Sequence, residues 1–175
     1  MLKIEGLCKN FGKMEVLKQL DLTVQDGSIY GLVGINGAGK STLLRCIAGV
    51  YEPETGSVKL NGHDTFHDEK IRKKIAFVSD EQYYPIGSTI LTLRQMYESL
   101  YDFDHDAYEK YMNLFELDEK ASVLNLSKGN KRRVALVMAL STKPDLLLLD
   151  EAYDGLEPLV RYRFRQVLAE LVEEG

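Results

Sequence analysis

The stretch GINGAGKST at residues 34–42 constrains the fold of this chain more than any other feature of the sequence. It follows the apolar run 28–33, which predicts a strand, and leads into a predicted helix that begins at Lys40 and stops near Gly49. A glycine-rich turn between a strand and a helix matches the pattern G-x-x-x-x-G-K-S/T. This order of elements is typical of α/β proteins, in which helices connect parallel strands.

The chemistry of the same stretch predicts a phosphate site rather than a glycine-rich turn that binds nothing. Its three glycines are expected to adopt positive φ, which lets the backbone approach a ligand closely. The loop amides and the unpaired N–H groups at the helix start would then converge on phosphate oxygens. Lys40 would supply a charge to the β- and γ-phosphates, Ser41 a hydroxyl to Mg²⁺, and Thr42 a hydroxyl to the α-phosphate. The predicted nucleotide-binding residues of the loop are Gly34, Asn36, Gly37, Ala38, Gly39, Lys40, Ser41 and Thr42.

A second motif, LLLLDE at residues 146–151, is an apolar run that ends in two carboxylates. It predicts a strand that is buried on both faces of a parallel sheet, with Asp150 at its carboxyl edge beside the phosphate loop. Asp150 would hold Mg²⁺ through water, and Glu151 would orient or deprotonate an attacking water. Taken alone, the run favours a strand that leads into a solvated turn, and it is the pairing with the phosphate loop that favours the metal and catalytic roles.

A third motif, LSKGNKRR at residues 126–133, places basic side chains directly after a serine that resembles a helix cap. Cations are unfavourable at a helix start because the backbone dipole is positive there. The run is therefore either a solvated helix start or a site whose ligand is negatively charged. A triphosphate would reverse the unfavourable sign.

These motifs, in this order, resemble those of the ATP-binding cassette (ABC) ATPase family, and the resemblance covers essentially the whole chain. LSKGNKRR occupies the place of the family's LSGGQ signature, and DEAYDGLEP at 150–158 resembles the family's DEPTSGLDP. The resemblance implies an ATPase that binds ATP and Mg²⁺ and works as two cassettes packed head to tail. The signature of one cassette would then meet the γ-phosphate held by the other; in this chain its residues are Ser127, Lys128, Gly129 and Asn130.

The resemblance implies roles for three further residues. Phe11 matches the aromatic residue that stacks on adenine, Glu157 takes the place of the D-loop aspartate, and Asp80 falls where the family has a glutamine. Asp80 is expected to reach Mg²⁺ or water. The predicted catalytic residues are therefore Glu151 and Asp80, and the predicted metal ligands are Ser41, Asp150 and Asp80.

The chain departs from the family pattern at several positions. Lys128 and Asn130 replace a glycine and the final glutamine of the signature, and Ala152 replaces the proline after the catalytic glutamate. The family's switch histidine would fall beyond Gly175. We therefore expect the chain to continue past Gly175, and we expect the 175-residue chain to bind nucleotide but to hydrolyse it poorly.

The sequence predicts an α/β fold with three parts: a P-loop NTPase core with a mainly parallel sheet, an N-terminal antiparallel β subdomain and a helical insertion. Besides the two strands named above, short apolar runs predict strands at 2–7, 20–24, 57–60 and 75–78. The predicted domains are an ATP-binding core of residues 1–84 and 132–175, and a helical subdomain of residues 85–131 that carries the signature.

Three helices are predicted beyond the phosphate loop. Thr92 and Gln95 have the spacing of a capping box, and Asp104 is placed to cap a helix that runs to about Glu116. The apolar residues of the last stretch recur at helical spacing up to Gly175, which is expected to end the helix as a C′ residue. The positions at this spacing are Val160, Phe164, Val167, Leu168, Leu171 and Val172.

Composition narrows the functions that remain. The net charge is −5, which argues against a general nucleic-acid-binding surface, and no apolar run approaches the length of a membrane span. The two cysteines lack metal-ligand spacing, so a reduced, cytoplasmic protein is expected.

The preferred hypothesis is the ATP-binding subunit of an ABC transporter, bound at the inner face of the cell membrane to a transmembrane permease subunit. A bacterial exporter is favoured by analogy with LSKG-type signatures. The alternatives are a soluble ABC-superfamily ATPase that is not coupled to transport, and an unrelated P-loop kinase.

Overall fold

The computed structural model describes residues 1–173, which divide into two compact units. The first unit holds residues 1–72 together with the residues from 168 onward, and the second holds residues 73–167. Among the described residues, no helix combines the length and the apolar character that crossing a membrane would need.

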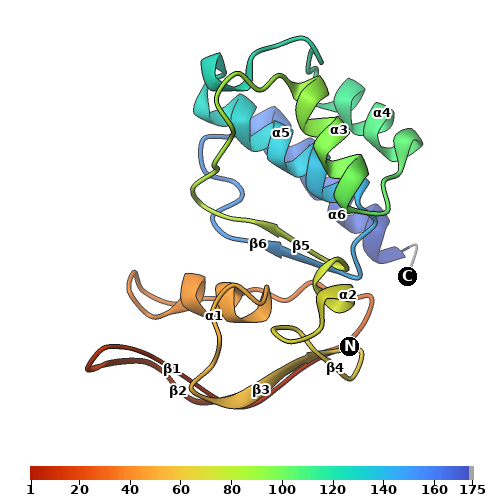
Figure 1. Ribbon diagram of the computed structural model, residues 1–175. Coiled ribbons are helices and arrows are strands. Elements are labelled where there is room, and N and C mark those ends of the chain that lie inside the picture. Colours follow the sequence, from red (N-terminus) through yellow and green to blue (C-terminus); the bar gives the residue numbers. More distant parts are fainter. Residues whose placement is uncertain (174–175) are drawn as a thin grey trace. The chain divides into compact units, whose positions relative to one another are not determined.

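An antiparallel sheet forms the centre of the first unit (Figure 1). Its strand order is β2-β1-β3-β4, so the N-terminal strand pairs with a neighbour on each side. Along β1, Leu2, Ile4 and Leu7 are buried while Lys3 is exposed, as expected for a sheet with one face on a core. The predicted antiparallel β subdomain is confirmed, with strands β1 (Leu2–Phe11), β2 (Met14–Val24), β3 (Thr55–Leu60) and β4 (His63–Asp64).

The helix predicted after the glycine-rich stretch is present as α1 (Lys40–Ile47). Its buried residues, Leu43, Leu44, Cys46 and Ile47, lie on one side, and the helix contacts β2 and β3. Gly49 follows the C-cap in the left-handed region, at φ 70°. A side chain at Gly49 would meet the Thr65 carbonyl oxygen at 2.5 Å, so glycine is required both for the turn and for the close approach.

The strand predicted at 28–33 is wrong. This segment joins neither sheet, and its apolar side chains other than the half-buried Leu32 are solvent-exposed: Ile29 is 67% exposed and Val33 is 98% exposed. An apolar run becomes a strand only when a neighbouring strand supplies hydrogen-bonding partners and a packing surface. The apolar composition of residues 28–33 therefore predicted a strand, but the segment pairs with no other strand.

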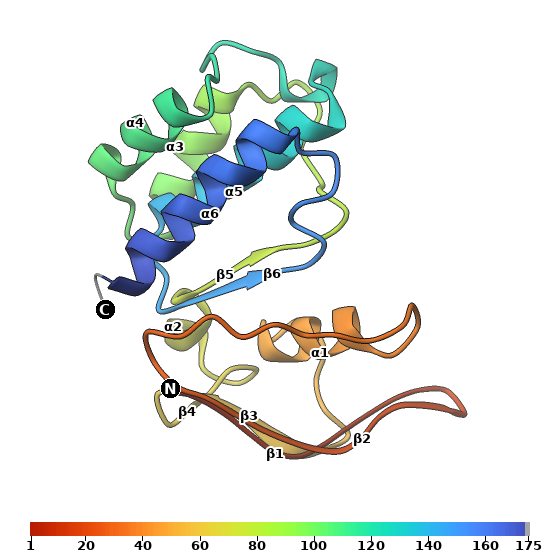
Figure 2. The same ribbon diagram turned by 180° about the vertical axis from the view of Figure 1, so that it is seen from behind.

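The second unit contains a parallel pair, β5 (Ile75–Val78) and β6 (Leu146–Leu149), which Figure 2 shows side by side. The pairing runs in register from Ile75 opposite Leu146 to Val78 opposite Leu149, so the predicted parallel strands are confirmed. Burial on both faces is found in β5, where the adjacent Ile75 and Ala76 are both buried. It is not found in β6, where only Leu148 is buried and the other residues are half-buried.

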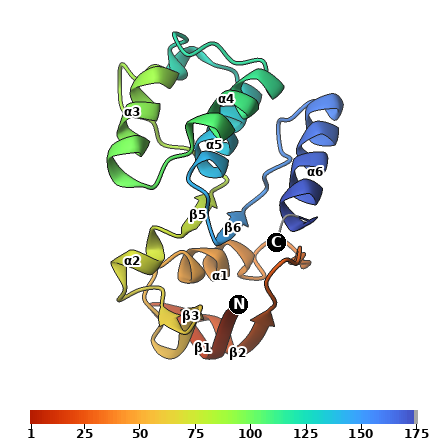
Figure 3. The same ribbon diagram turned by 90° about the vertical axis from the view of Figure 1, so that its right-hand side faces the viewer.

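The predicted helical region is confirmed and holds α3 (Ile90–Leu100), α4 (His105–Leu114) and a 3₁₀ turn (Val123–Asn125). Both helices pack on α5 (Lys128–Ser141), as Figure 3 shows. The capping box predicted at Thr92 and Gln95 is wrong, because the N-cap is Thr89 and the reciprocal bonds join Thr89 to Thr92.

Two helices remain, a short one and a long one. The short one is α2 (Glu69–Arg72), a single turn in the first unit. The C-terminal helix α6 (Pro158–Glu173) is as predicted, with Val160, Phe164 and Val167 buried. The C′ role predicted for Gly175 lies outside the described residues.

The N-cap of α4 gives a test of the local structure. Asp104 accepts hydrogen bonds from the amides of Asp106 and Ala107 at 2.9 and 3.0 Å, and its carboxylate lies 2.8 Å from Lys143 Nζ. The hydrogen bond from Lys143, followed by those from the amides, lowers the pKa of Asp104 below its ordinary value. A carboxyl whose pKa is lower in the folded state stabilises the fold above its unfolded pKa and loses that contribution as the pH falls.

We expect Asp104→Ala to lower the free energy of unfolding by about 1 kcal/mol at pH 7. The difference should shrink below about pH 4, where the unfolded carboxyl is protonated. Urea unfolding at pH 7 and below about pH 4 measures the difference in the free energy of unfolding between variant and parent. Glu109→Ala on the exposed side of the same helix is the control. A difference that does not change with pH would contradict the capping role.

Candidate functional site

The glycine-rich stretch is an exposed loop that ends at the start of α1. Gly37 and Gly39 have φ of 83° and 89°, as predicted. Gly34 lies outside the left-handed region, so the prediction of positive φ is wrong there. Space is the reason for glycine at this position, because a Cβ would lie 3.3 Å from the Ala38 Cβ.

Gly39 is the N-cap of α1 and lies against β2. An added Cβ would meet Leu17 Cδ2 and Val16 Cγ1 at 3.1 Å each. Together with its left-handed φ, this crowding leaves glycine as the residue that fits. The contact with β2 therefore fixes where the free amides of the helix start are held.

Lys40 closes the loop on itself. Its Nζ donates to the carbonyl oxygens of Gly34 and Ile35 at 2.7 and 2.9 Å, and the Ala38 amide donates to Ile35 at 3.2 Å. The first turn of α1 carries no acidic residue. Three features therefore favour a bound anion at this loop. They are the ammonium group of Lys40, the exposed amides of the loop, and a helix start whose positive dipole no acidic residue compensates.

Phe11 stands at the end of β1 in the same unit. Its ring is 42% exposed and contacts Tyr51 edge to face, with ring centroids 5.5 Å apart. Lys9 Nζ lies 5.6 Å from the centroid of the Phe11 ring. The ring is thus supported from behind yet open to solvent, and stacking on adenine stays a prediction.

Three carboxylates follow the parallel strands of the second unit. The Asp150 amide donates to the Val78 carbonyl at 2.9 Å, extending the ladder by one residue. Asp80 follows β5 by two residues, and Glu151 follows β6 by two, so both lie at the carboxyl edge of this pair. Glu151 is exposed and has φ 49°, a left-handed conformation that costs a non-glycine residue about 1–3 kcal/mol.

Asp150 is the most informative of these carboxylates. Its side chain is buried, and Oδ2 has no hydrogen-bond partner. A buried carboxylate oxygen without a partner is unfavourable unless a cation or a donor reaches it. Mg²⁺ prefers oxygen ligands and often binds through one or two carboxylates, so Asp150 fits that ion. The described residues hold no group of three or more His, Cys, Asp or Glu arranged for a metal.

The signature begins α5 as predicted. Ser127 is the N-cap, and its hydroxyl accepts from the Asn130 amide at 3.2 Å. Lys128 forms an ion pair with Asp154 of the following D-loop. A Cβ on Gly129 would lie 2.5 Å from the Gly155 carbonyl oxygen, so the first turn of α5 and the D-loop touch through their backbones.

The basic run does not form one open surface. Arg132 is buried and donates to the carbonyls of Ser79 and Asp80. Arg133 lies 3.5 Å from the Glu157 carboxylate. Helical spacing could have indicated this outcome, because Arg132 lies four residues before Leu136 on the buried side of α5.

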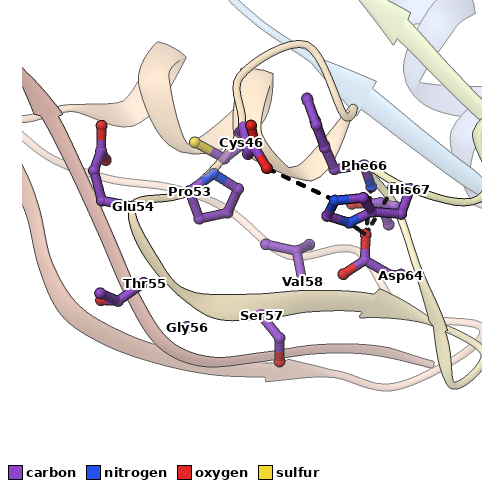
Figure 4. A pocket seen from close by; sticks show the side chains of 12 residues that line it. Cys46, Pro53, Glu54, Thr55, Gly56, Ser57, Val58, Asp64, Phe66 and His67 are labelled. Atoms are coloured by element: carbon purple, nitrogen blue, oxygen red, sulfur yellow. Dashed lines mark hydrogen bonds and ion pairs between the residues drawn. The ribbon is translucent and has the colours of Figure 1, made fainter.

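A pocket of about 90 Å³ lies in the first unit and is shown in Figure 4. His67 lies at its rim, with Nδ1 3.1 Å from Asp64 Oδ1 and Nε2 3.7 Å from Glu52 Oε1. Buried Cys46 lines the pocket, and burial raises the pKa of its thiol to about 11. The pocket contains none of the predicted site residues and is too small for a nucleotide.

The predicted residues fall into two groups. Phe11 and the loop residues up to Thr42 belong to the first unit. The second unit holds Asp80, Asp150 and Glu151, the signature at 127–130, and Glu157, which is exposed. Sequence reasoning missed Arg132, Asp154 and Gly155, which hold the second group together.

The Gly129 contact generates a prediction. We expect Gly129→Ala to lower the free energy of unfolding by about 1–3 kcal/mol, because the new methyl group must displace the Gly155 carbonyl. Urea unfolding measures the change, and Lys131→Ala on the same helix is the control. Equal stability of Gly129→Ala and the parent would show that the loops do not touch as described.

Comparisons with known proteins agree with this geometry. A family model described as "ABC transporter" matches residues 17–154. The "Sulfate/thiosulfate import ATP-binding protein CysA" of Synechocystis sp. is 35% identical over 98% of this chain and 50% of its own length. A solved "ATP binding subunit of ABC transporter" is 26% identical with a TM-score of 0.92, over 100% of this chain and 76% of that one.

The fold is also that of the dimeric bacterial cassette MJ0796, at 24% identity and a TM-score of 0.86, over 99% of this chain and 84% of that one. The chain spans between 50% and 64% of the length of the curated relatives it matches. With the family model matching most of the chain and the predicted motifs in family order, the chain belongs to the ABC transporter family.

Proposed function

We propose that this chain binds and hydrolyses ATP as the energy-supplying subunit of an ABC transporter. The observation that carries the proposal is the geometry at Lys40. Its ammonium group and the left-handed Gly37 and Gly39 surround the uncompensated start of α1. Such a loop binds phosphate groups through amides and charge, whatever the nucleoside attached to them.

Mg²⁺ is proposed as the accompanying ion. The buried Oδ2 of Asp150 supplies a carboxylate oxygen, and Ser41 and Asp80 are the further proposed ligands. A bound Mg²⁺ would neutralise phosphate charge. Glu151 is the proposed base, because it is exposed at the same strand edge and can accept a proton from water.

A second cassette is the proposed partner for the signature. Ser127, Lys128 and Gly129 lie at the start of α5, where free amides face outward, and Ser127 and Lys128 are exposed. The dimeric cassette with the same fold supports this arrangement. Lys128 would have to leave Asp154 to reach a phosphate, and an ion pair this exposed to solvent holds the lysine only weakly.

A transmembrane permease subunit is the proposed second partner, which would place the chain at the inner face of the membrane. The segment after Asp80 exposes two large apolar side chains, Tyr83 at 87% and Ile86 at 93%. Neighbouring exposed apolar groups suit a partner's helix. Tyr84, which lies between them in the sequence, does not share this patch and instead donates its hydroxyl hydrogen bond to the Lys131 carbonyl.

The direction of transport is proposed as export, from the LSKG-type signature and Asp80 alone. The curated relative CysA is named for import, so the proposal needs a direct test. The test isolates the protein from membranes with its permease and places the pair in vesicles. Export predicts that ATP drives substrate away from the side of the membrane that carries this chain. Movement of substrate toward that side would refute export.

Nucleotide binding is tested through the lysine. We expect Lys40→Met to weaken ATP binding about 10-fold or more, because it removes charged hydrogen bonds to phosphate. Titration with a fluorescent ATP analogue measures the affinity, with Lys13→Met in the β1–β2 turn as the control. Unchanged affinity in Lys40→Met, with Lys13→Met also unchanged, would mean that the loop is not the phosphate site.

Hydrolysis is tested through the carboxylate. We expect Glu151→Gln to lower kcat at least about 100-fold while ATP binding persists. An ATP-bound dimer should then accumulate and be visible by light scattering. Glu109→Gln on α4 is the matched control. Parent-like turnover in Glu151→Gln would remove Glu151 from the role of base.

A further inference from the structure

The segment that follows β5, residues 79–84, is bonded to α5 by a buried arginine. We call this segment the Asp80 loop. Arg132 is 2% exposed, and its two terminal nitrogens donate to successive carbonyls, Nη1 to Ser79 and Nη2 to Asp80 at 2.9 Å. One side chain of the signature helix therefore holds both peptide groups that flank the Asp80 Cα.

A second bond joins the same two elements four residues further along the loop. The Tyr84 hydroxyl donates to the Lys131 carbonyl at 2.8 Å. Burial raises the pKa of Tyr84 far above its ordinary value, so the hydroxyl keeps its proton and remains a donor at physiological pH. The loop is thus attached to adjacent residues of α5 near both of its ends.

The choice of arginine is informative because a buried cation is unfavourable. Its two described hydrogen bonds go to neutral backbone carbonyls, which offset less of the desolvation than bonded carboxylates would, although its charge also acts on the Asp154 carboxylate. An apolar side chain would fill the same space without that cost. The planar guanidinium does one thing an apolar residue cannot: it binds two carbonyls at fixed spacing.

We propose that Arg132, supported by Tyr84, is a positioning residue that sets the place of Asp80 by holding the backbone of the Asp80 loop on the signature helix. Ser127, the N-cap of that helix, begins the turn that precedes Arg132. A displacement of the helix start would then move Asp80 with it. The consequence for hydrolysis rests on the proposed function, whereas the attachment of the loop does not.

Hydrogen–deuterium exchange in the nucleotide-free protein tests the attachment. We expect Arg132→Gln and Tyr84→Phe to speed the exchange of amides in residues 79–84 while exchange in α3 stays at the parent level. Arg133→Gln removes the same charge from the next residue and is the matched control. Tyr84→Phe deletes a single oxygen, so it decides the question even if Arg132→Gln folds poorly. Parent-like exchange of the loop in Tyr84→Phe and Arg132→Gln would overturn the proposal.

Steady-state kinetics tests the consequence for Asp80. We expect Arg132→Gln to lower kcat about 10-fold, because a small misplacement of a catalytic group is costly, with the KM for ATP nearly unchanged. Arg132→Lys should recover part of kcat, since an ammonium can still bind one carbonyl.

In an Asp80→Asn background, Arg132→Gln should cause little further loss, because the arginine acts through Asp80. Equal fold-losses in the two backgrounds would show that Arg132 acts elsewhere and would overturn the positioning role. If the parent neither binds nor hydrolyses ATP, the proposed function fails, and the exchange experiment still decides whether the loop is attached.

Discussion

The in-register parallel pairing of β5 and β6 is the constraint on which the second unit depends. Because Val78 lies opposite Leu149, both strands end at one level, and the residues that follow them emerge at one edge. The bond from the Asp150 amide to the Val78 carbonyl extends this order past the last strand residue. A shift of one residue would turn Asp150 toward the opposite face and bury a leucine side chain where the carboxylate now stands.

The helices build outward from that edge. The first turn of α5 meets the residues after β6 where Gly129 lies against the Gly155 carbonyl, and the ion pairs of Lys128 with Asp154 and of Arg133 with Glu157 join the same two segments. Exposed ion pairs contribute little singly, so the backbone contact and the buried Arg132 bonds carry the arrangement. In the first unit, the packing of Gly39 on β2 plays the same structural role. The glycine lets the loop approach the strand closely, and this contact fixes the polar groups beside it.

Much of this could be predicted because the signals were local. Ser127 and Asp104 cap helices where their side chains were expected to, and the strands 75–78 and 146–149 have the apolar letters that parallel strands need. The misses came from partners that are distant in sequence. Whether 28–33 forms a strand depends on a neighbour rather than on its own composition. The capping box predicted at Thr92 lies three residues too late, because Thr89, with a hydroxyl of the same kind one turn earlier, is the N-cap. Arg132 was grouped with exposed cations because its acceptors lie some fifty residues away.

The lysine of the glycine-rich loop has a consequence for how tightly the loop can hold any anion. Its ammonium group already has two carbonyl acceptors, so it does not wait in water for a ligand. An incoming phosphate competes with those carbonyls, and only the difference between the two sets of bonds appears in the measured affinity. The same carbonyls keep the ammonium close to the helix start, which reduces the entropy lost when a ligand arrives. The loop therefore exchanges some strength of binding for a cation that is already in place.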